Sequence, residues 1–155
     1  MTQITTRAEF GVDRKEAFEF LTDPHNWDLF YSNLTGLVGD EPQTLAKRGD
    51  TVNFHYSILG RRVQANAVAQ EVVYGEKVLL TVSIPGLPDV HQEWTYSDTP
   101  DGFAAEVTMN TEEATSFLGK AVDRFVVPRA LQRDLEKTLE NMKQMFSIGI
   151  PAADN

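Results

Sequence analysis

The alternation of apolar and polar residues predicts an antiparallel sheet through the middle of the chain. In residues 51–58, Val52, Phe54, Tyr56 and Ile58 alternate with polar neighbours. A period of two indicates a strand with one buried face. Similar strand patterns are found in residues 2–12, 62–69, 78–84, 90–98 and 103–111. Short turn-forming segments separate the strands from residue 51 onward, so we expect these strands to form an antiparallel meander.

Helical spacing is found between the first strand and the sheet. Asp13 is a suitable N-cap for a helix over residues 14–22, with Glu16 at the capping-box position. Asp23 and Pro24 then predict a second short helix over residues 24–31, because proline is well tolerated at a first helical position. This second helix would carry Trp27 and Phe30.

The last predicted element is a long amphipathic helix. Leu131, Leu135, Thr138, Met142 and Met145 follow one another at three- and four-residue steps, and Leu118, Val122 and Phe125 continue the stripe upstream. An unbroken helix over residues 117–147 would be about 45 Å long. Pro128 removes one helical hydrogen bond, so we expect a kink or break near residues 124–128. The half before Pro128 would then be the more mobile half.

Composition and charge narrow the possible functions. A chain of 155 residues with 41% hydrophobic content is expected to form one domain over residues 1–150, with a short tail over 151–155. The absence of cysteine excludes disulfides and thiolate metal sites. A net charge of −9 disfavours nucleic acid and anionic membranes as partners. The N-terminus does not resemble a signal peptide, and no apolar run reaches bilayer length, so we expect a cytoplasmic protein without membrane insertion.

No cofactor is predicted. The three histidines are spread along the chain without the spacing of metal ligands. The chain also lacks a glycine-rich phosphate loop, a dinucleotide fingerprint and a nucleophile elbow. A homodimer formed through an edge strand remains an open alternative.

Three passages of the sequence carry a resemblance to a known family. Residues 17–27 read AFEFLTDPHNW, residues 101–103 read DGF, and residues 135–143 read LEKTLENMK. Together with the order of the elements, these passages resemble the SRPBCC superfamily of START and birch-pollen-allergen-like proteins, and within it the polyketide cyclase/dehydrase group. The resemblance implies an α+β helix-grip fold, in which a curved antiparallel sheet wraps around a long C-terminal helix and two short helices follow the first strand.

In such a fold, the inward face of the sheet would line a ligand cavity. Small inward residues such as Ala65 and Ala67 lie among aromatic residues and leave room for a ligand; the alternative is that the aromatic side chains alone fill the space. The residues predicted to bind the ligand are Phe18, Trp27, Phe30, Phe54, Tyr56, Ala65, Ala67, Val82, Gln92, Trp94, Tyr96, Val107, Met109, Leu118, Val122 and Phe125.

Two functions follow from this arrangement. The first is binding of an apolar or aromatic small molecule that is lipid- or polyketide-like. The second is a cofactor-independent cyclase or dehydratase, for which Tyr56, Tyr96 and Arg124 are the candidate catalytic residues, since a phenol can stabilise an enolate. His91 and Glu93 share a strand face, but alternation with Trp94 places them toward solvent. A protein-interaction module is disfavoured, because the outward residues of the first two meander strands are polar.

Overall fold

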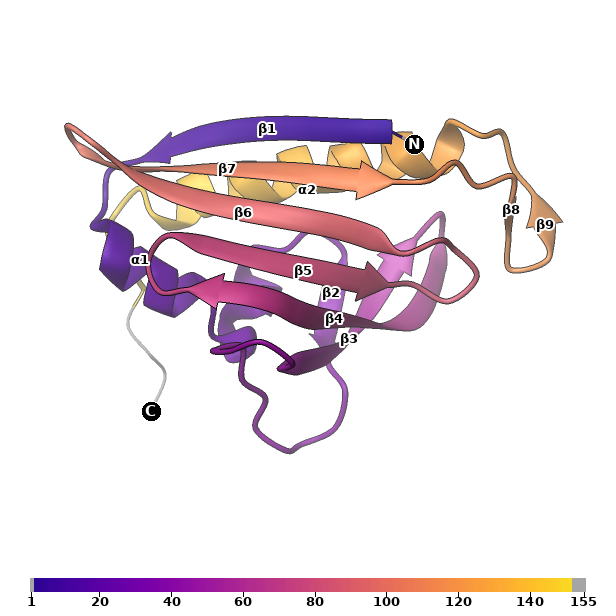
Figure 1. Ribbon diagram of the computed structural model, residues 1–155, viewed down its shortest axis with the longest axis horizontal. Helices are drawn as coiled ribbons and strands as arrows, with labels where there is room; N and C mark the ends of the chain where they lie inside the picture. The colour runs from indigo at the N-terminus through magenta and orange to yellow at the C-terminus, as the bar shows by residue number, and fades with distance from the viewer. Residues whose placement is uncertain (1, 152–155) are drawn as a thin grey trace.

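The structure is a computed structural model that describes residues 2–151 (Figure 1). The predicted tail covers residues 151–155, and its residues after Pro151 lie outside the described part of the chain. The main elements are β1 (Thr2–Phe10), α1 (Arg14–Leu21), the 3₁₀ helix η1 (Pro24–Leu29), β2 (Leu34–Leu37), β3 (Thr51–Ile58), β4 (Arg61–Val73), β5 (Lys77–Ser83), β6 (Val90–Thr99), β7 (Gly102–Thr111) and α2 (Val126–Met145). A small hairpin, β8 (Ser116–Phe117) and β9 (Lys120–Ala121), precedes α2.

The main sheet has seven antiparallel strands in the order β1-β7-β6-β5-β4-β3-β2. Strands β3 to β7 form the predicted meander, β2 adds one edge strand, and β1 forms the opposite edge by pairing with β7 along its whole length. The short strand β2 was not predicted, since its four residues include Gly36 at a register shift and carry little alternation. The sheet is curved, and α2 runs along it beside β1 (Figure 1). The predicted helix-grip fold is confirmed.

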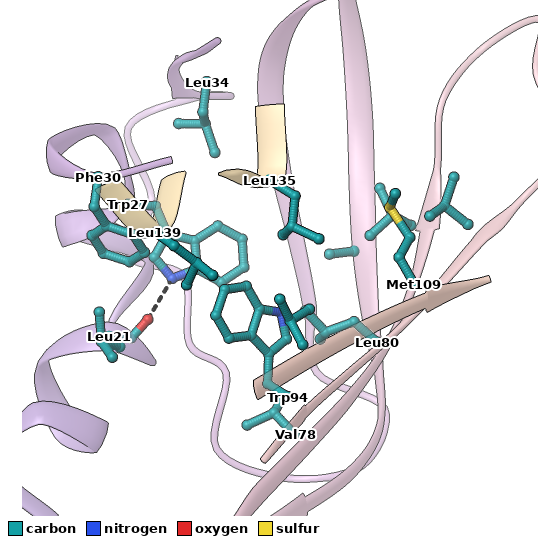
Figure 2. Close-up of a cluster of buried hydrophobic side chains, with 14 of the residues drawn as sticks. Leu21, Trp27, Phe30, Leu34, Val78, Leu80, Trp94, Met109, Leu135 and Leu139 are labelled. Atoms are coloured by element: carbon teal, nitrogen blue, oxygen red, sulfur yellow. Dashed lines mark hydrogen bonds between the residues drawn. The ribbon is translucent and has the colours of Figure 1, made fainter. Parts of the chain in front are cut away.

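Both short helices begin at the predicted caps. The Asp13 side chain accepts a hydrogen bond from the Glu16 backbone N–H at 3.0 Å, and the Asp23 side chain accepts one from the His25 N–H at 3.1 Å. The second helix is a 3₁₀ helix. It is fixed to α1 because Trp27 Nε1 donates to the Leu21 carbonyl oxygen at 2.9 Å (Figure 2). Such caps and cross-links satisfy backbone groups that helix ends leave unpaired.

The predicted helix over residues 117–147 is wrong in its first third. Helix α2 begins at Val126 and has 20 residues, which corresponds to about 30 Å. Pro128 is its third residue, where a backbone N–H would have no partner within the helix, so the proline causes no kink. Residues 116–121 instead form the β8–β9 hairpin, with Leu118 and Gly119 at positive φ in its turn.

The alternation of buried and exposed residues is confirmed in the central strands. On β3, Val52, Phe54, Tyr56 and Ile58 are all buried, while their neighbours are at least partly exposed. On β6, Trp94 is buried and His91 and Glu93 are exposed, as predicted. The core therefore lies between the concave face of the sheet, α2 and the two short helices.

The contact between the ends of β1 and β7 yields a stability test. A Cβ added at Gly102 would overlap the Phe10 carbonyl oxygen and lie 2.8 Å from Val12 N, whereas a Cβ at Gly11 would meet its nearest atom at 3.9 Å. We expect Gly102→Ala to lower the free energy of unfolding by at least ~2 kcal/mol and Gly11→Ala to change it by less than about 0.5 kcal/mol. Urea denaturation measures both. Equal effects of the two substitutions would contradict the close approach.

Candidate functional site

A cavity of about 80 Å³ lies between the concave face of the sheet and α2. Side chains from η1 and the segment after it, from six strands of the sheet and from α2 surround it. In Figure 2, Leu135 of α2 lies between Trp27 of η1 and the sheet residues Leu80 and Met109. The residues that line the cavity are Trp27, Tyr31, Ser32, Leu34, Phe54, Tyr56, Ala67, Leu80, Val82, Ile84, Val90, Gln92, Met109, Leu131, Asp134, Leu135 and Thr138.

The cavity is small for a ligand site. Ligand pockets usually measure about 300–1,000 Å³, so this one in its present state admits a group of only a few heavy atoms. Aromatic side chains occupy part of the space that the small inward residues leave. Ala67 lines the cavity, whereas Ala65 is buried in the core and does not line the cavity. A larger ligand therefore requires α2 to separate from the segments packed against it.

One carboxylate interrupts the apolar wall of the cavity. Asp134 lies on α2 between Leu131 and Leu135, and both of its carboxylate oxygens accept hydrogen bonds. The Tyr56 hydroxyl donates a hydrogen bond to Oδ2, and Asn33 Nδ2 donates to Oδ1 at 2.6 Å. The carboxylate is therefore held between β3 and the segment that leads into β2.

A second polar contact lies one helical turn further along α2. Thr138 Oγ1 accepts a hydrogen bond from Ser32 N at 2.9 Å and donates to the Asp134 backbone carbonyl at 2.8 Å. Asn141 Nδ2 also donates to the Phe30 carbonyl oxygen at 3.1 Å. Residues 30–33 are thus tied to α2 by side-chain hydrogen bonds. This seam, the contact between residues 30–33 and α2, is therefore closed by side-chain hydrogen bonds and not by a strand ladder.

The protonation behaviour of this cluster follows from its burial. Burial raises the pKa of Asp134, and the hydrogen bonds from Tyr56 and Asn33 offset part of that increase. Burial raises the pKa of Tyr56 above its usual range, and the neighbouring Asp134 carboxylate raises it further. Tyr56 therefore stays protonated, and its proton points to Asp134 instead of into the cavity.

Asp134 was missed from the sequence, although a signal for it exists. It lies three residues after Leu131 and four before Thr138, so helical spacing places it on the apolar face. A single carboxylate within an apolar stripe is the feature that would have identified it. Tyr31, in the segment after η1, and Leu34 of β2 also line the cavity without having been predicted, because their positions depend on how the chain returns over the sheet.

The predicted ligand-binding residues divide into three groups. Those that line the cavity are Trp27, Phe54, Tyr56, Ala67, Val82, Gln92 and Met109. Those buried in the core outside the lining are Phe18, Phe30, Ala65, Trp94, Tyr96 and Val107. The third group does not reach the cavity, because the helix expected to carry it does not form there; its members are Leu118, Val122 and Phe125.

The three candidate catalytic residues are not brought together. The Tyr96 ring packs against Phe18, with ring centroids 5.2 Å apart, and burial raises its pKa well above the usual value. Arg124 is exposed, and its guanidinium carbon lies 4.6 Å from the centre of the Phe125 ring. Of these three residues, Tyr56 reaches the cavity, and its hydroxyl proton is engaged by Asp134.

The sheet wall also carries an amide. Gln92 lines the cavity, and its Oε1 accepts a hydrogen bond from Trp94 Nε1 at 3.1 Å. This bond leaves the amide Nε2 as a hydrogen-bond donor.

Within residues 2–151, no group of three or more His, Cys, Asp or Glu side chains is placed to hold a metal ion. Within the same range, no helix is long and apolar enough to span a bilayer.

A helix packed across a curved antiparallel sheet, with a cavity between them, defines the helix-grip class. Residues 1–146 match the model of the family described as polyketide cyclase / dehydrase and lipid transport, and the chain belongs to this family. The resemblance to SRPBCC proteins is thereby confirmed. No curated protein matches the chain in sequence.

Solved structures share the fold at low sequence identity. CV1439 from Chromobacterium violaceum has a TM-score of 0.69 at 13% identity, covering 94% of this chain and 98% of its own. CalU16 from Micromonospora echinospora has a TM-score of 0.62 at 16% identity, covering 94% and 76%. Ara h 8.0201 has a TM-score of 0.66 at 10% identity, covering 94% and 97%. At these identities the similarity establishes the fold alone.

The seam between Ser32 and α2 can be tested by removing one hydroxyl. Thr138→Val keeps the side-chain shape but leaves the Ser32 N–H without its acceptor. An unsatisfied, partly buried donor costs about 1–3 kcal/mol, and we expect a loss of this size in urea denaturation. Thr138→Ser keeps the hydroxyl and should lose less. Equal stability of wild type and Thr138→Val would show that the bond does not hold the seam.

The Tyr56–Asp134 bond can be tested through the Asp134 pKa. Tyr56→Phe removes a donor that stabilises the carboxylate, so the Asp134 pKa should rise above its wild-type value. A pH titration of the side-chain carboxyl ¹³C resonance measures this change. Tyr74→Phe is the control, since the Tyr74 hydroxyl donates to Glu19 and not to Asp134. An unchanged Asp134 pKa in Tyr56→Phe would refute the contribution of the bond.

Proposed function

We propose that this protein binds an apolar or aromatic small molecule, lipid- or polyketide-like, in the cavity between the sheet and α2. The observation that carries the proposal is an apolar cavity enclosed by sheet and helix, with its polar groups confined to a few positions, including Asp134, Tyr56 and Gln92. Ligand pockets typically combine apolar walls with a few polar groups that orient the ligand. The family description, which includes lipid transport, supports the same function.

The ligand would enter by opening the seam between residues 30–33 and α2. Three side-chain hydrogen bonds close this seam, from Asn33 to Asp134, from Ser32 to Thr138 and from Asn141 to Phe30. A neutral bond of this kind contributes about 0.5–1.5 kcal/mol net and the bond from Asn33 to the Asp134 carboxylate about 1.5–3 kcal/mol, because water replaces the lost partner. The strand ladders can therefore stay intact while the cavity enlarges, whereas the buried Phe30 ring moves with the seam.

A ring-closing enzyme is the second candidate. Its support is Asp134, a carboxylate beside an apolar cavity whose pKa is raised by burial, as suits a general base. Such a reaction also needs a donor for the developing oxyanion. The Tyr56 hydroxyl donates to Asp134 in this structure, so it would first have to change partners. Binding without chemistry requires no such change, and we therefore favour it.

Thermal stabilisation by apolar ligands tests the proposed function. A ligand at 100 times its Kd stabilises the folded state by about 2.7 kcal/mol, which raises Tm by roughly 5–10 °C for a chain of this size. We expect such shifts from members of a panel of polycyclic aromatic compounds, flavonoids and lipids. Ala67→Leu should abolish them by filling the cavity from its floor.

The matched control is Val68→Leu, which enlarges the next residue of β4 on the opposite face of the strand. Ligand shifts that survive in Ala67→Leu, or a wild-type protein that no panel member stabilises, would refute the proposed site. Mass spectrometry of bound ligands after incubation separates the two candidate functions. Recovery of the ligand with unchanged mass and unchanged chromatographic retention supports binding. Loss of water, or a product of the same mass with a new retention time, supports the enzyme, because ring closure alone is an isomerisation.

A further inference from the structure

We infer that the cavity selects neutral or cationic ligands whose polar group donates a hydrogen bond to Asp134, and that it rejects apolar carboxylates such as fatty acids. The inference rests on the proposed function and specifies the chemical class of its ligand. It follows from which polar atoms face the cavity and from the charge they carry. The inference concerns the polar group of the ligand, whereas the apolar walls of the cavity determine which apolar ring system or chain can bind.

Asp134 is a partly buried carboxylate without a cationic partner. Its two hydrogen bonds come from the neutral groups Tyr56 OH and Asn33 Nδ2. Among the residues that the structure describes, no Lys, Arg or His forms an ion pair with it. Charges removed from water are usually paired, because an unpaired charge is costly in a less polar environment. A ligand ammonium or hydroxyl group would provide the missing partner.

The surrounding charges reinforce this preference. Of the residues that line the cavity, Asp134 is the one with a carboxyl side chain, and none is Lys, Arg or His. The nearby basic residue Lys137 points outward on α2 and pairs with Glu140 at 3.6 Å. The chain as a whole carries a net charge of −9. A ligand carboxylate would therefore meet repulsion within the cavity and find no cation to offset its loss of hydration.

The directions of the hydrogen bonds favour a donor on the ligand. The Tyr56 hydroxyl uses its single proton on Asp134, so toward a ligand both groups act as acceptors. Thr138 Oγ1 already accepts from Ser32 N and donates to the Asp134 carbonyl. The amide of Gln92 retains a donor on the sheet wall, which can serve a carbonyl or ether oxygen elsewhere on the ligand.

Three ligands that share a naphthalene ring system and differ only in their polar group test the inference. We would compare 2-naphthylmethylamine, 2-naphthylmethanol and 2-naphthoate by isothermal titration calorimetry on the full chain at pH 7. The wild-type protein should bind the amine at least tenfold more tightly than the carboxylate, with the alcohol between them. This ranking tests the inference without any substitution.

The isosteric variant Asp134→Asn removes the charge while keeping an acceptor for Tyr56. Amine binding should weaken about tenfold, carboxylate binding should strengthen, and alcohol binding should change less than threefold. Glu136→Gln is the control, because it removes the same charge from an exposed position on α2 and should leave the ranking unchanged. Circular dichroism confirms that both variants are folded.

Three outcomes overturn the inference. The first is wild-type binding of the naphthoate as tightly as the amine, and the second is an unchanged ranking in Asp134→Asn. In both of these outcomes the apolar body still binds, so the proposed function survives while the ligand class is wrong. The third is no binding of any of the three ligands together with no thermal shift from the wider panel, which overturns the proposed function as well.

Discussion

The packing of α2 into the concave face of the sheet is the contact on which the other features depend. Leu131, Leu135, Leu139 and Met142 are each at most 6% exposed. Burial of one such side chain contributes roughly 1.5–3 kcal/mol, so these contacts outweigh the individual hydrogen bonds around them. Without α2, the inward aromatic residues of β3 and β6 would face water. The helix therefore stabilises the sheet and forms one wall of the cavity.

The same contact is not uniformly packed along its length. The apolar stripe of α2 continues beyond the cavity to Leu139 and Met142, where packing is complete. The cavity lies near Leu131 and Leu135, where α2 faces small or β-branched residues such as Ala67 and Val82. The opening proposed for ligand entry lies beside this part of the helix, where Ser32 and Asn33 are held by side-chain hydrogen bonds. Local differences of this kind are typical of binding sites.

Much of the fold could be predicted from the sequence, because alternation and caps are local signals. The period of two on β3 and the caps at Asp13 and Asp23 needed no tertiary information. Residues 116–125 could not be predicted in this way, since Leu118, Val122 and Phe125 have helical spacing by chance. The positive φ of Leu118 and Gly119 closes a hairpin there instead. For the site, the alternation of inward and outward residues along the strands identified the residues of the sheet that line the cavity. The residues of α2 that line it could be identified only once the start of the helix was known.

Asp134 is the residue that packing alone explains least. The seam is already closed by Thr138 and Asn141, and an apolar side chain at position 134 would complete the stripe. Replacing a buried charged group by an apolar one of similar volume is often neutral or stabilising. A carboxylate at this position therefore brings a desolvation cost that its two neutral donors offset only in part. A ligand donor would offset more of that cost, which connects the least favourable residue of the cavity wall with the binding function proposed for it.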